Sequence, residues 1–400
     1  MYNRCLYYAT TPGLENFSNK DLKISRRRAQ RVPPWKVFYD MNDYDGRMRG
    51  SDTTAGTKRR AFLRRSAGLA GAASISGLAG CFGSGDSGSS DRPGSDGELI
   101  MKTASETTAA YSMSQVIASA VSQNSDVSVD ARPSQGTNRN VSEVVQGKTE
   151  IAYIQNWTAN KIRQGEKPFA DLDHQPYQVF HLYDLAWFLA SANGGWESVS
   201  DIGSGATVSP TPSGSGTAEM LEHSLSFVTE DYERTSVSYG DQAGAMSEGR
   251  LDVGAATYVN LSIEPGWLQQ MKSTVDLRVL DWPDKVVQEL KDDPAIVVSD
   301  IDMSQFENYG YTPDTLSTPT LAYNFIVRDD MDYDTLYSFL EALWAQREGL
   351  KEQTGLLAPL SSGDAWVKNA YAGIPFHPAA ADFYEEQGLW SDEFERGEEP

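Results

Sequence analysis

The chain has 400 residues, which is enough for two ordinary domains, and its 40% hydrophobic and 10% aromatic residues are enough to bury a core in each. This composition excludes a disordered chain. The formal net charge of -22 excludes nucleic-acid binding, because such proteins need basic patches that displace counterions from phosphates.

The charge is unevenly distributed along the chain. Residues 1–80 hold 15 Lys and Arg against 6 Asp and Glu, whereas residues 81–400 hold 19 against 50. Acidic residues scattered over a whole body keep its surface soluble by self-repulsion in strong salt, where screening is severe. The pattern favours a halophilic source, and an ordinary acidic mesophilic protein is the alternative.

Both cysteines, Cys5 and Cys81, precede the acidic body. That body therefore has no disulfide, zinc cluster or cysteine nucleophile. The chain also has no run of about 18 apolar residues, so we expect no helix that spans a membrane.

A segment with the order of an export signal begins at Lys58. "KRRAFL", residues 58–63, resembles a twin-arginine signal, and weakly apolar residues follow it. "LAGC", residues 78–81, resembles a lipobox, in which Cys81 becomes lipid-modified and begins the mature protein. An amphipathic or core helix is disfavoured, because four glycines fall between residues 68 and 80. We interpret residues 48–81 as a twin-arginine signal whose lipid anchors the protein to the outer face of the cytoplasmic membrane.

The segments on either side of this signal differ in character. Residues 1–47 hold an unpatterned basic run, and Met48 begins a short basic lead. We therefore expect residues 1–47 to be a spurious extension from a start codon assigned too early. Residues 82–98 are nearly all Gly, Ser and Asp, a composition that makes a flexible tether.

From Leu99 the pattern becomes α/β. Alternating or apolar runs predict strands at 99–105, 127–134 and 150–157, and helical spacing predicts helices at 109–123 and 138–148, the latter ending at Gly147. Strands joined to helices by short connections imply parallel pairing with helices packed on the sheet. Residues 177–191 are predicted to form a long buried strand.

A second α/β unit repeats this order. Strands are expected at 206–212, 235–240 and 251–259, and helices at 213–228 and 241–250. "VVQGKTEIAYIQ" in the first unit and "MSEGRLDVGAATY" in the second are local echoes of each other. A third region contains "LAYNFIVRDD", residues 321–330, and a predicted helix at 334–349.

Two similar units joined by long strands predict a two-lobe clamshell, similar to type II periplasmic binding proteins. Such folds hold their ligand between the lobes, at the carboxyl ends of the strands. We assign residues 99–191 and 300–400 to lobe 1 and residues 192–299 to lobe 2.

Two motif matches fail on their context. "SEVVQGKT", residues 142–149, imitates a phosphate-binding loop, but it runs from helix into strand, whereas the motif needs strand, loop and helix. Asp330, Asp332, Asp334 and Glu341 have the spacing of a calcium-binding loop. Thr335 stands where that loop needs Gly, so an acidic helix N-terminus is the better interpretation.

The segment "SGSGTAEML", residues 213–221, lies between a strand and a helix and allows two interpretations. The amides of Gly214, Gly216 and Thr217 could hold a carboxylate or phosphate at the helix start, or the glycines could simply form a turn that caps the helix. The four histidines have no metal-ligand spacing, and no catalytic constellation is found. We therefore expect a protein that is not an enzyme and has no cofactor.

Several ordered blocks resemble the TAXI family, the solute-binding proteins of tripartite (TRAP) transporters. They are "TASETTAAY", "PSQGTNRNVSEVVQGKTEIAYIQ", "SPTPSGSGTAEML", "SEGRLDVGAA" and the closing "GIPFHPAAADFYEEQG". The chain departs from the family pattern at Thr137, where Ser is usual, at Ala379, where Gly is usual, and at 205–208, which replace the usual "Gly-Lys-x-Val". The resemblance implies two α/β lobes that close on a small organic acid or amino acid and deliver it to membrane subunits.

The same resemblance implies a ligand site built from hydroxyls, amides and backbone N–H groups. Its expected residues are Ser105, Thr107, Tyr111, Gly136, Thr137, Asn140, Gln155, Ser213, Ser215, Gly216, Thr217 and Tyr258. Arg132 and Arg139 are the nearest cations. Trp157 is expected either as an apolar wall of the site or as a core residue.

Together these features predict a lipid-anchored, extracytoplasmic solute-binding protein of a TRAP-type carrier, with the membrane subunits as partners. A surface sensor that signals to a membrane receptor is the alternative. An exported enzyme ranks third because no catalytic constellation is found.

Overall fold

Strand β1 begins at Glu98 in the computed structural model, which describes residues 98–106, 108–212 and 215–399. The expected export signal, Cys81 and all of the expected tether except Glu98 therefore lie outside the described residues. None of the described helices combines the length and the apolar character needed to cross a bilayer.

The strands of the described chain form one mixed sheet in the order β2-β1-β3-β10-β4-β7-β5-β6, with β8 beside β4 and β9 beside β10. The expected parallel pairing occurs at β1–β2, β1–β3 and β5–β7, whereas β4 and β10 run antiparallel to their neighbours. The strand bounds are β1 Glu98–Lys102, β2 Ser128–Arg132, β3 Ile151–Gln155, β4 Pro176–Ser191, β5 Thr207–Ser209, β6 Glu233–Arg234, β7 Val253–Val259, β8 Arg278–Leu280, β9 Val297–Asp302 and β10 Thr315–Arg328.

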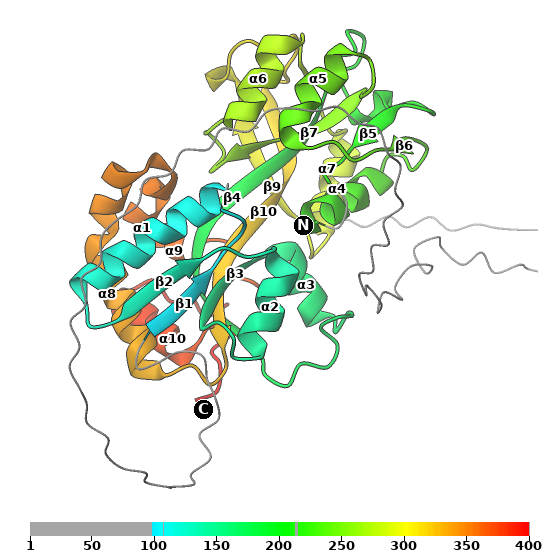
Figure 1. Ribbon diagram of the computed structural model, residues 1–400. Coiled ribbons are helices and arrows are strands. Elements are labelled where there is room, and N and C mark those ends of the chain that lie inside the picture. Colours follow the sequence, from blue (N-terminus) through cyan, green and yellow to red (C-terminus); the bar gives the residue numbers. More distant parts are fainter. Residues whose placement is uncertain (1–97, 107, 213–214, 400) are drawn as a thin grey trace, which may run out of the picture. The chain divides into compact units, whose positions relative to one another are not determined.

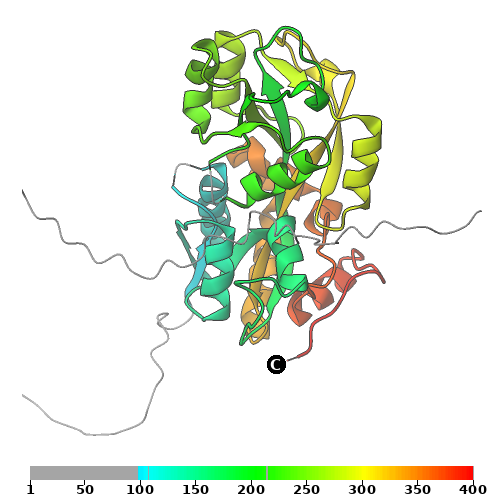
Figure 2. The same cartoon turned by 90° about the vertical axis from the view of Figure 1, so that its right-hand side faces the viewer.

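Strands β4 and β10 connect two lobes (Figure 1). The first half of β4 pairs with the last half of β10, which also pairs with β3. The remaining halves pair with β7, β8 and β9 instead. Each long strand therefore changes partners along its length and passes from one lobe to the other. Figure 2 shows the two lobes one above the other.

Helices cover both faces of the sheet in each lobe. In lobe 1, α2 and α3 pack on one face against Ala152, Ile154 and Ile326, and α1, α8 and α10 pack on the other. The lobe 1 helices are α1 Ala109–Asn124, α2 Thr137–Val145, α3 Asn156–Arg163, α8 Tyr333–Gln353, α9 Gly363–Trp366 and α10 Pro378–Glu386, with a 3-10 helix at Gly355–Ser361. Lobe 2 contains α4 Gly216–Ser226, α5 Gln242–Ser247, α6 Gly266–Thr274 and α7 Asp284–Asp292, with 3-10 helices at Val199–Asp201, Tyr239–Asp241 and Met303–Gln305.

Local sequence explains where these helices begin and end. Thr108 caps α1 by accepting a hydrogen bond from the N–H of Tyr111, and Met113, Ile117 and Val121 repeat at helical spacing on its buried face. After α2, Gly147 takes a left-handed conformation (φ 63°), which lets the chain turn directly into β3. The echoed segment of lobe 2 uses Gly249 in the same way (φ 68°) between α5 and β7.

Three expectations differ from the structure. Residues 300–320, expected in lobe 1, pack with lobe 2, because Ile301, Met303 and Leu316 share a core with α5 and α6. The strand expected at 235–240 is absent from the described chain, where a two-residue strand, β6, precedes this stretch. The strand expected to run to Trp157 ends at Gln155, and α3 begins at the next residue.

Candidate ligand-binding cleft

A cavity of about 360 Å³ lies where the lobes meet. This volume suits a small organic ligand. Lobe 1 contributes the loop before α2, the first residues of α2 and the end of β3, and lobe 2 contributes the turn before α4. The lining residues are Gln135, Gly136, Thr137, Asn138, Arg139, Tyr153, Gln155, Pro212, Ser215, Gly216, Thr217 and Tyr323.

Three helices begin at this cavity. Gly136, Gln155 and Ser215 are the N-caps of α2, α3 and α4, respectively, and all three line the cavity. Ser215 caps its own helix by accepting a hydrogen bond from the N–H of Ala218, whereas Gly136 has no side chain to cap α2 and the Gln155 side chain does not cap α3. Helix N-termini leave N–H groups without intrahelical partners and carry partial positive charge, so they favour an anionic ligand group.

Tyrosines form the wall of the cavity on the side of the connecting strands. Tyr323 stacks on Tyr183 with 4.7 Å between ring centroids, and the rings of Tyr153 and Tyr323 lie 4.9 Å apart. Burial raises the pKa of Tyr323 well above its usual value, and it raises the pKa of Tyr153 as well. Both phenols therefore stay neutral at ordinary pH and remain able to donate hydrogen bonds. The side chain of Thr217 in lobe 2 lies close enough to the Tyr323 hydroxyl to offset a small part of this rise.

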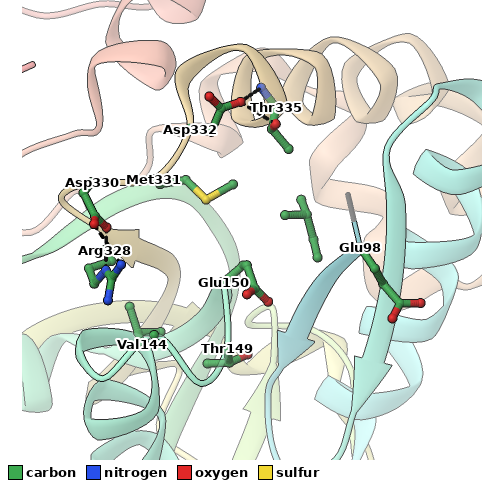
Figure 3. Close-up of a pocket in the computed structure, with 11 residues that line it drawn as sticks. Glu98, Val144, Thr149, Glu150, Arg328, Asp330, Met331, Asp332 and Thr335 are labelled. Atoms are coloured by element: carbon green, nitrogen blue, oxygen red, sulfur yellow. Dashed lines mark hydrogen bonds and ion pairs between the residues drawn. The ribbon is translucent and has the colours of Figure 1, made fainter. Parts of the chain in front are cut away.

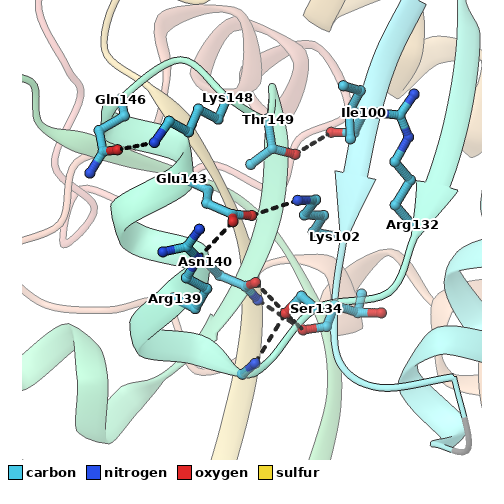
Figure 4. Close-up of polar contacts among 12 residues, drawn as sticks. Ile100, Lys102, Arg132, Ser134, Arg139, Asn140, Glu143, Gln146, Lys148 and Thr149 are labelled. Carbon is cyan, nitrogen blue, oxygen red and sulfur yellow. Dashed lines mark hydrogen bonds and ion pairs between the residues drawn. The ribbon is translucent and has the colours of Figure 1, made fainter. Parts of the chain in front are cut away.

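Arg139 is the charged residue among those that line the cavity. Its Nε lies 2.7 Å from Oε1 of Glu143, and Nζ of Lys102 lies 2.6 Å from Oε2 of the same carboxylate (Figure 4). Burial raises the pKa of Glu143, but the hydrogen bonds from Lys102 and Arg139 outweigh this effect and hold the pKa below its usual value. Glu143 is thus ionised and fixes Arg139, which is about half exposed, at the mouth of the cavity.

Gly216 allows the two lobes to approach each other closely. A Cβ added at this position would lie 1.9 Å from Nε2 of Gln155, which is only 2% exposed. A side chain at 216 would therefore displace the Gln155 amide. The capping interpretation is confirmed, since Ser215 caps α4, and Gly216 and Thr217 of the same turn line the cavity. Anion binding by the amides of this turn stays a prediction.

The structure brings six of the expected site residues together in this cavity. These are Gly136, Thr137, Gln155, Ser215, Gly216 and Thr217. Ser105 lines a neighbouring hollow that shares Gln135 with the cavity. Thr107 and Ser213 lie outside the described residues.

Three other expected residues point elsewhere, and we leave them out of the proposed site. Asn140 is fully buried, and its Nδ2 donates to the carbonyls of Thr103 and Tyr153 (2.9 and 2.8 Å). The hydroxyl of Tyr111 is directed to the carbonyl of Ala131 on β2 (3.5 Å). Tyr258 is also fully buried, because its position in β7 faces the core under α5 and α6.

Tyr258 illustrates the consequence of strand alternation. Its ring stacks on Phe306 with 4.0 Å between centroids, and its hydroxyl lies 2.8 Å from that of Tyr309. In the alternating pattern of β7, Tyr258 lies on the face that packs against α5 and α6, and it is not among the residues that line the cavity.

The sequence interpretation missed Gln135, Asn138, Tyr153, Pro212 and Tyr323. Tyr153 had a usable signal, since it precedes Gln155 by two residues in β3 and therefore lies on the same face of the strand. Tyr323 had none, because β10 joins the site only through its pairing with β3 and β4. Arg132, one of the two cations expected nearby, pairs with Asp130 at 2.6 Å and is not among the lining residues.

A second cavity, of about 250 Å³, lies at the opposite end of β3 (Figure 3). Arg328 lies in it, and Asp330 binds the guanidinium through both carboxylate oxygens (2.5 and 2.8 Å). The N-terminus of α8 also borders it, where Asp332 accepts a hydrogen bond from the N–H of Thr335 (2.9 Å). An acidic cap thus occupies this helix start, as the sequence indicated, and the site does not suit an anion.

His174 lies beside two carboxylates near this second cavity. Its Nδ1 is 2.7 Å from Oδ1 of Asp329, and donor atoms of His174, Asp329 and Asp330 all lie within 4.8 Å of one another. Asp329 also accepts the N–H of Gln175, and Asp330 binds Arg328. These contacts satisfy the carboxylates within the protein, so we assign no metal site here.

Comparisons with known proteins place the chain in a wider context. Residues 101–388 match the model of the NMT1-like family. No curated protein matches the chain.

Solved structures give weaker likenesses. The ligand-binding component of an ABC-type import system from Staphylococcus aureus, with zinc bound, is 12% identical over 76% of this chain and 97% of its own, with a TM-score of 0.38. The periplasmic aliphatic sulphonate binding protein of Escherichia coli is 14% identical over 76% and 93%, with a TM-score of 0.39.

Proposed function

The chain belongs to the NMT1-like family, and we propose that it is an extracytoplasmic solute-binding protein that captures a small organic acid or amino acid. The observation that carries this proposal is the convergence of the N-termini of α2, α3 and α4 on one cavity between the lobes. We propose that the protein binds its ligand without transforming it.

The lining explains how such a ligand would be selected. The helix N-termini and Arg139 attract a carboxylate, and no Asp or Glu is among the described residues that line the cavity to repel one. The neutral hydroxyls of Tyr153, Tyr323 and Thr217 can orient the rest of a polar molecule. An organic cation would meet the positive ends of three helices, so binding of a cation is disfavoured.

We further propose that the protein works with the membrane subunits of a TRAP-type carrier and is held at the membrane by lipid on Cys81. The sequence blocks that resemble the TAXI family and the lipobox at residues 78–81 support this assignment. Co-purification of the tagged protein from its native membrane tests it. Recovery of TRAP-type membrane subunits supports the carrier. Recovery of an ATP-hydrolysing permease or of a sensor kinase would contradict the TRAP assignment.

Ligand capture is tested by a thermal-shift screen followed by titration calorimetry in molar KCl. Succinate and L-glutamate are compared with succinamide, the neutral counterpart of succinate, and with putrescine, a cation. We expect a carboxylate to raise the melting temperature, and we expect the diamide and putrescine not to do so. A melting temperature raised by putrescine but by neither acid would contradict an anion site.

A pair of variants locates the binding in the cleft. Arg139→Gln removes the cation that lines the cavity, whereas Arg132→Gln removes one that pairs with Asp130 and does not line it. We expect Arg139→Gln to weaken binding of the carboxylate that responds in the screen by roughly tenfold, as for a lost charge-assisted hydrogen bond. Equal weakening by both variants would indicate only a general effect of charge.

A further inference from the structure

Helix α3 of lobe 1 and helix α4 of lobe 2 contact each other beside the cavity. Nε1 of Trp157 donates to Oε2 of Glu219 at 2.9 Å, and Nζ of Lys161 donates to the same oxygen at 3.0 Å. The ring of Trp157 also packs against that of His223, with 5.2 Å between centroids. One carboxylate of lobe 2 thus receives two donors from lobe 1.

The spacing of these residues makes the contact possible. Trp157 and Lys161 are four residues apart on α3, and Glu219 and His223 are four residues apart on α4, so each pair projects from one face of its helix. Lys161 has an exposed side-chain fraction of only 16% and Glu219 one of 36%, which shields the ion pair from part of the solvent. None of the four residues lines the cavity.

Among the described residues, only two segments of the backbone connect the lobes. The chain passes between them only in β4 and β10 among the described residues, so the angle between the lobes depends on non-covalent contacts across the cleft. The contact between α3 and α4 is polar and directional. Because its donors and its acceptor lie on different lobes, separation of the lobes would break it.

We propose that Trp157, Lys161 and Glu219 form an interlobe clasp that stabilises the closed arrangement and thereby sets ligand affinity and release without touching the ligand. This inference rests on the proposed function, in which closure around a small acid is the binding event. Glu219 is a positioning residue that acts through Trp157 and Lys161. A contact made only in the closed state shifts the population toward it and raises the apparent affinity.

The helix offers a matched control for Glu219. Glu222 lies one turn further along α4, has an exposed side-chain fraction of 38% and forms an ion pair with Arg234 within lobe 2 (2.7 Å). Glu219→Ala and Glu222→Ala remove the same group from the same helix. Only the first variant removes a bond between the lobes.

Hydrogen–deuterium exchange of the full chain without ligand tests the clasp. We expect Glu219→Ala to speed exchange of the amides at 156–161 and 216–219 by roughly ten- to a hundredfold, the change that follows from losing a hydrogen bond to a charged group. Glu222→Ala should leave these amides at the wild-type rate. Equal rates for Glu219→Ala and wild type, or for the two variants, would overturn the proposal.

Trp157→Phe provides a second, milder variant in case Glu219→Ala fails to fold. It removes the indole donor but keeps a ring against His223, so we expect exchange between the wild-type rate and that of Glu219→Ala. Exchange at the wild-type rate would contradict a role for the indole bond in the clasp.

Calorimetry with succinate and L-glutamate then tests the link to affinity. Glu219→Ala should weaken binding of the acid that binds the wild-type protein, because it lowers the population of the closed arrangement, and Glu222→Ala should leave binding unchanged. If neither acid binds the wild-type protein, the proposed ligand class fails, whereas the exchange experiment still decides whether the clasp exists.

Discussion

Tyr183 and Tyr323 stack at the point where both connecting strands pass between the lobes, with 4.7 Å between ring centroids and 13° between ring planes. They are register partners on β4 and β10, and the register shifts immediately beyond Tyr323. The next residue of β4, Asp184, faces the opposite side of the sheet, where its carboxylate accepts from Lys368 (2.5 Å) and Asn369 (3.0 Å). The crossing point is thus supported on both faces, and it provides a fixed wall against which the lobes can close.

We expect Tyr323→Phe to weaken ligand binding and to leave the fold intact. The substitution keeps the ring stacked on Tyr183 but removes the hydroxyl, which lies near Thr217 on a residue that lines the cavity. Loss of one or two hydrogen bonds predicts roughly five- to thirty-fold weaker binding of succinate or L-glutamate by calorimetry. Tyr337→Phe is the control, since its hydroxyl bonds Glu386 in lobe 1 (2.6 Å). Equal losses for the two variants would argue against a hydroxyl role at Tyr323.

Gly216→Ala should reduce binding far more than it reduces stability. The new methyl group would lie 1.9 Å from Nε2 of Gln155, so the flexible Gln155 amide, which lines the cavity, has to shift to make room. We expect at least tenfold weaker binding and a melting temperature within a few degrees of wild type, because alanine itself favours the helix. Gly244→Ala, which meets no atom within 4 Å, is the control. Unchanged affinity in Gly216→Ala would show that Gln155 does not shape the ligand site.

The helices and strands that were predicted correctly are those that short-range sequence patterns mark. Helical spacing identified α1 and a long, mostly apolar run identified the buried strand β4, because both signals depend on residues a few positions apart. Helix α3 was missed because "EIAYIQNW" continues an apolar run past Gln155, where the chain turns into a helix without Gly or Pro. The location of β9 in lobe 2 follows from its pairing with β10, which no local pattern encodes.

Within the site, the loops rich in glycine and hydroxyl residues could be predicted from the sequence. The direction in which an individual side chain points was harder to predict. Gly136, Ser215 and Thr217 belong to helix starts, which sequence marks well. Asn140 lies one turn inside α2, so its side chain turns from the cavity toward β3. Tyr323 entered the site through an antiparallel pairing between segments far apart in the chain.

We expect Asn140→Asp to destabilise lobe 1 strongly. Nδ2 of Asn140 donates to the carbonyls of Thr103 and Tyr153, and Asp presents only oxygen atoms when ionised. Two buried carbonyls then lose their donor and a charge is buried, which predicts a loss of about 3 kcal/mol or more in the free energy of unfolding, measured by urea titration. Asn124→Asp, at an exposed position that donates to Ala120, should cost much less. Similar losses for both would contradict the assigned role of Asn140.

Stability should fall between about pH 6.5 and pH 4 because of His377. This residue caps α10 by accepting the N–H of Ala379 at Nδ1 (3.2 Å), and Nε2 donates to the carbonyl of Met331 (3.0 Å), so the folded state holds it neutral. Burial lowers its pKa from 6.5 to about 4, which exceeds the opposing effect of the bond to Met331. The unfolded chain therefore binds a proton first as the pH falls.

The contribution of His377 is thus fully present above about pH 6.5 and is lost as the pH falls toward 4, by up to about 3 kcal/mol. In His377→Asn, which retains a capping side chain, urea titrations across this range should give a lower free energy of unfolding at pH 7 but a flatter decline. Parallel curves for wild type and His377→Asn would show that the buried imidazole does not control this pH dependence, since the other titrating groups are the same in both proteins.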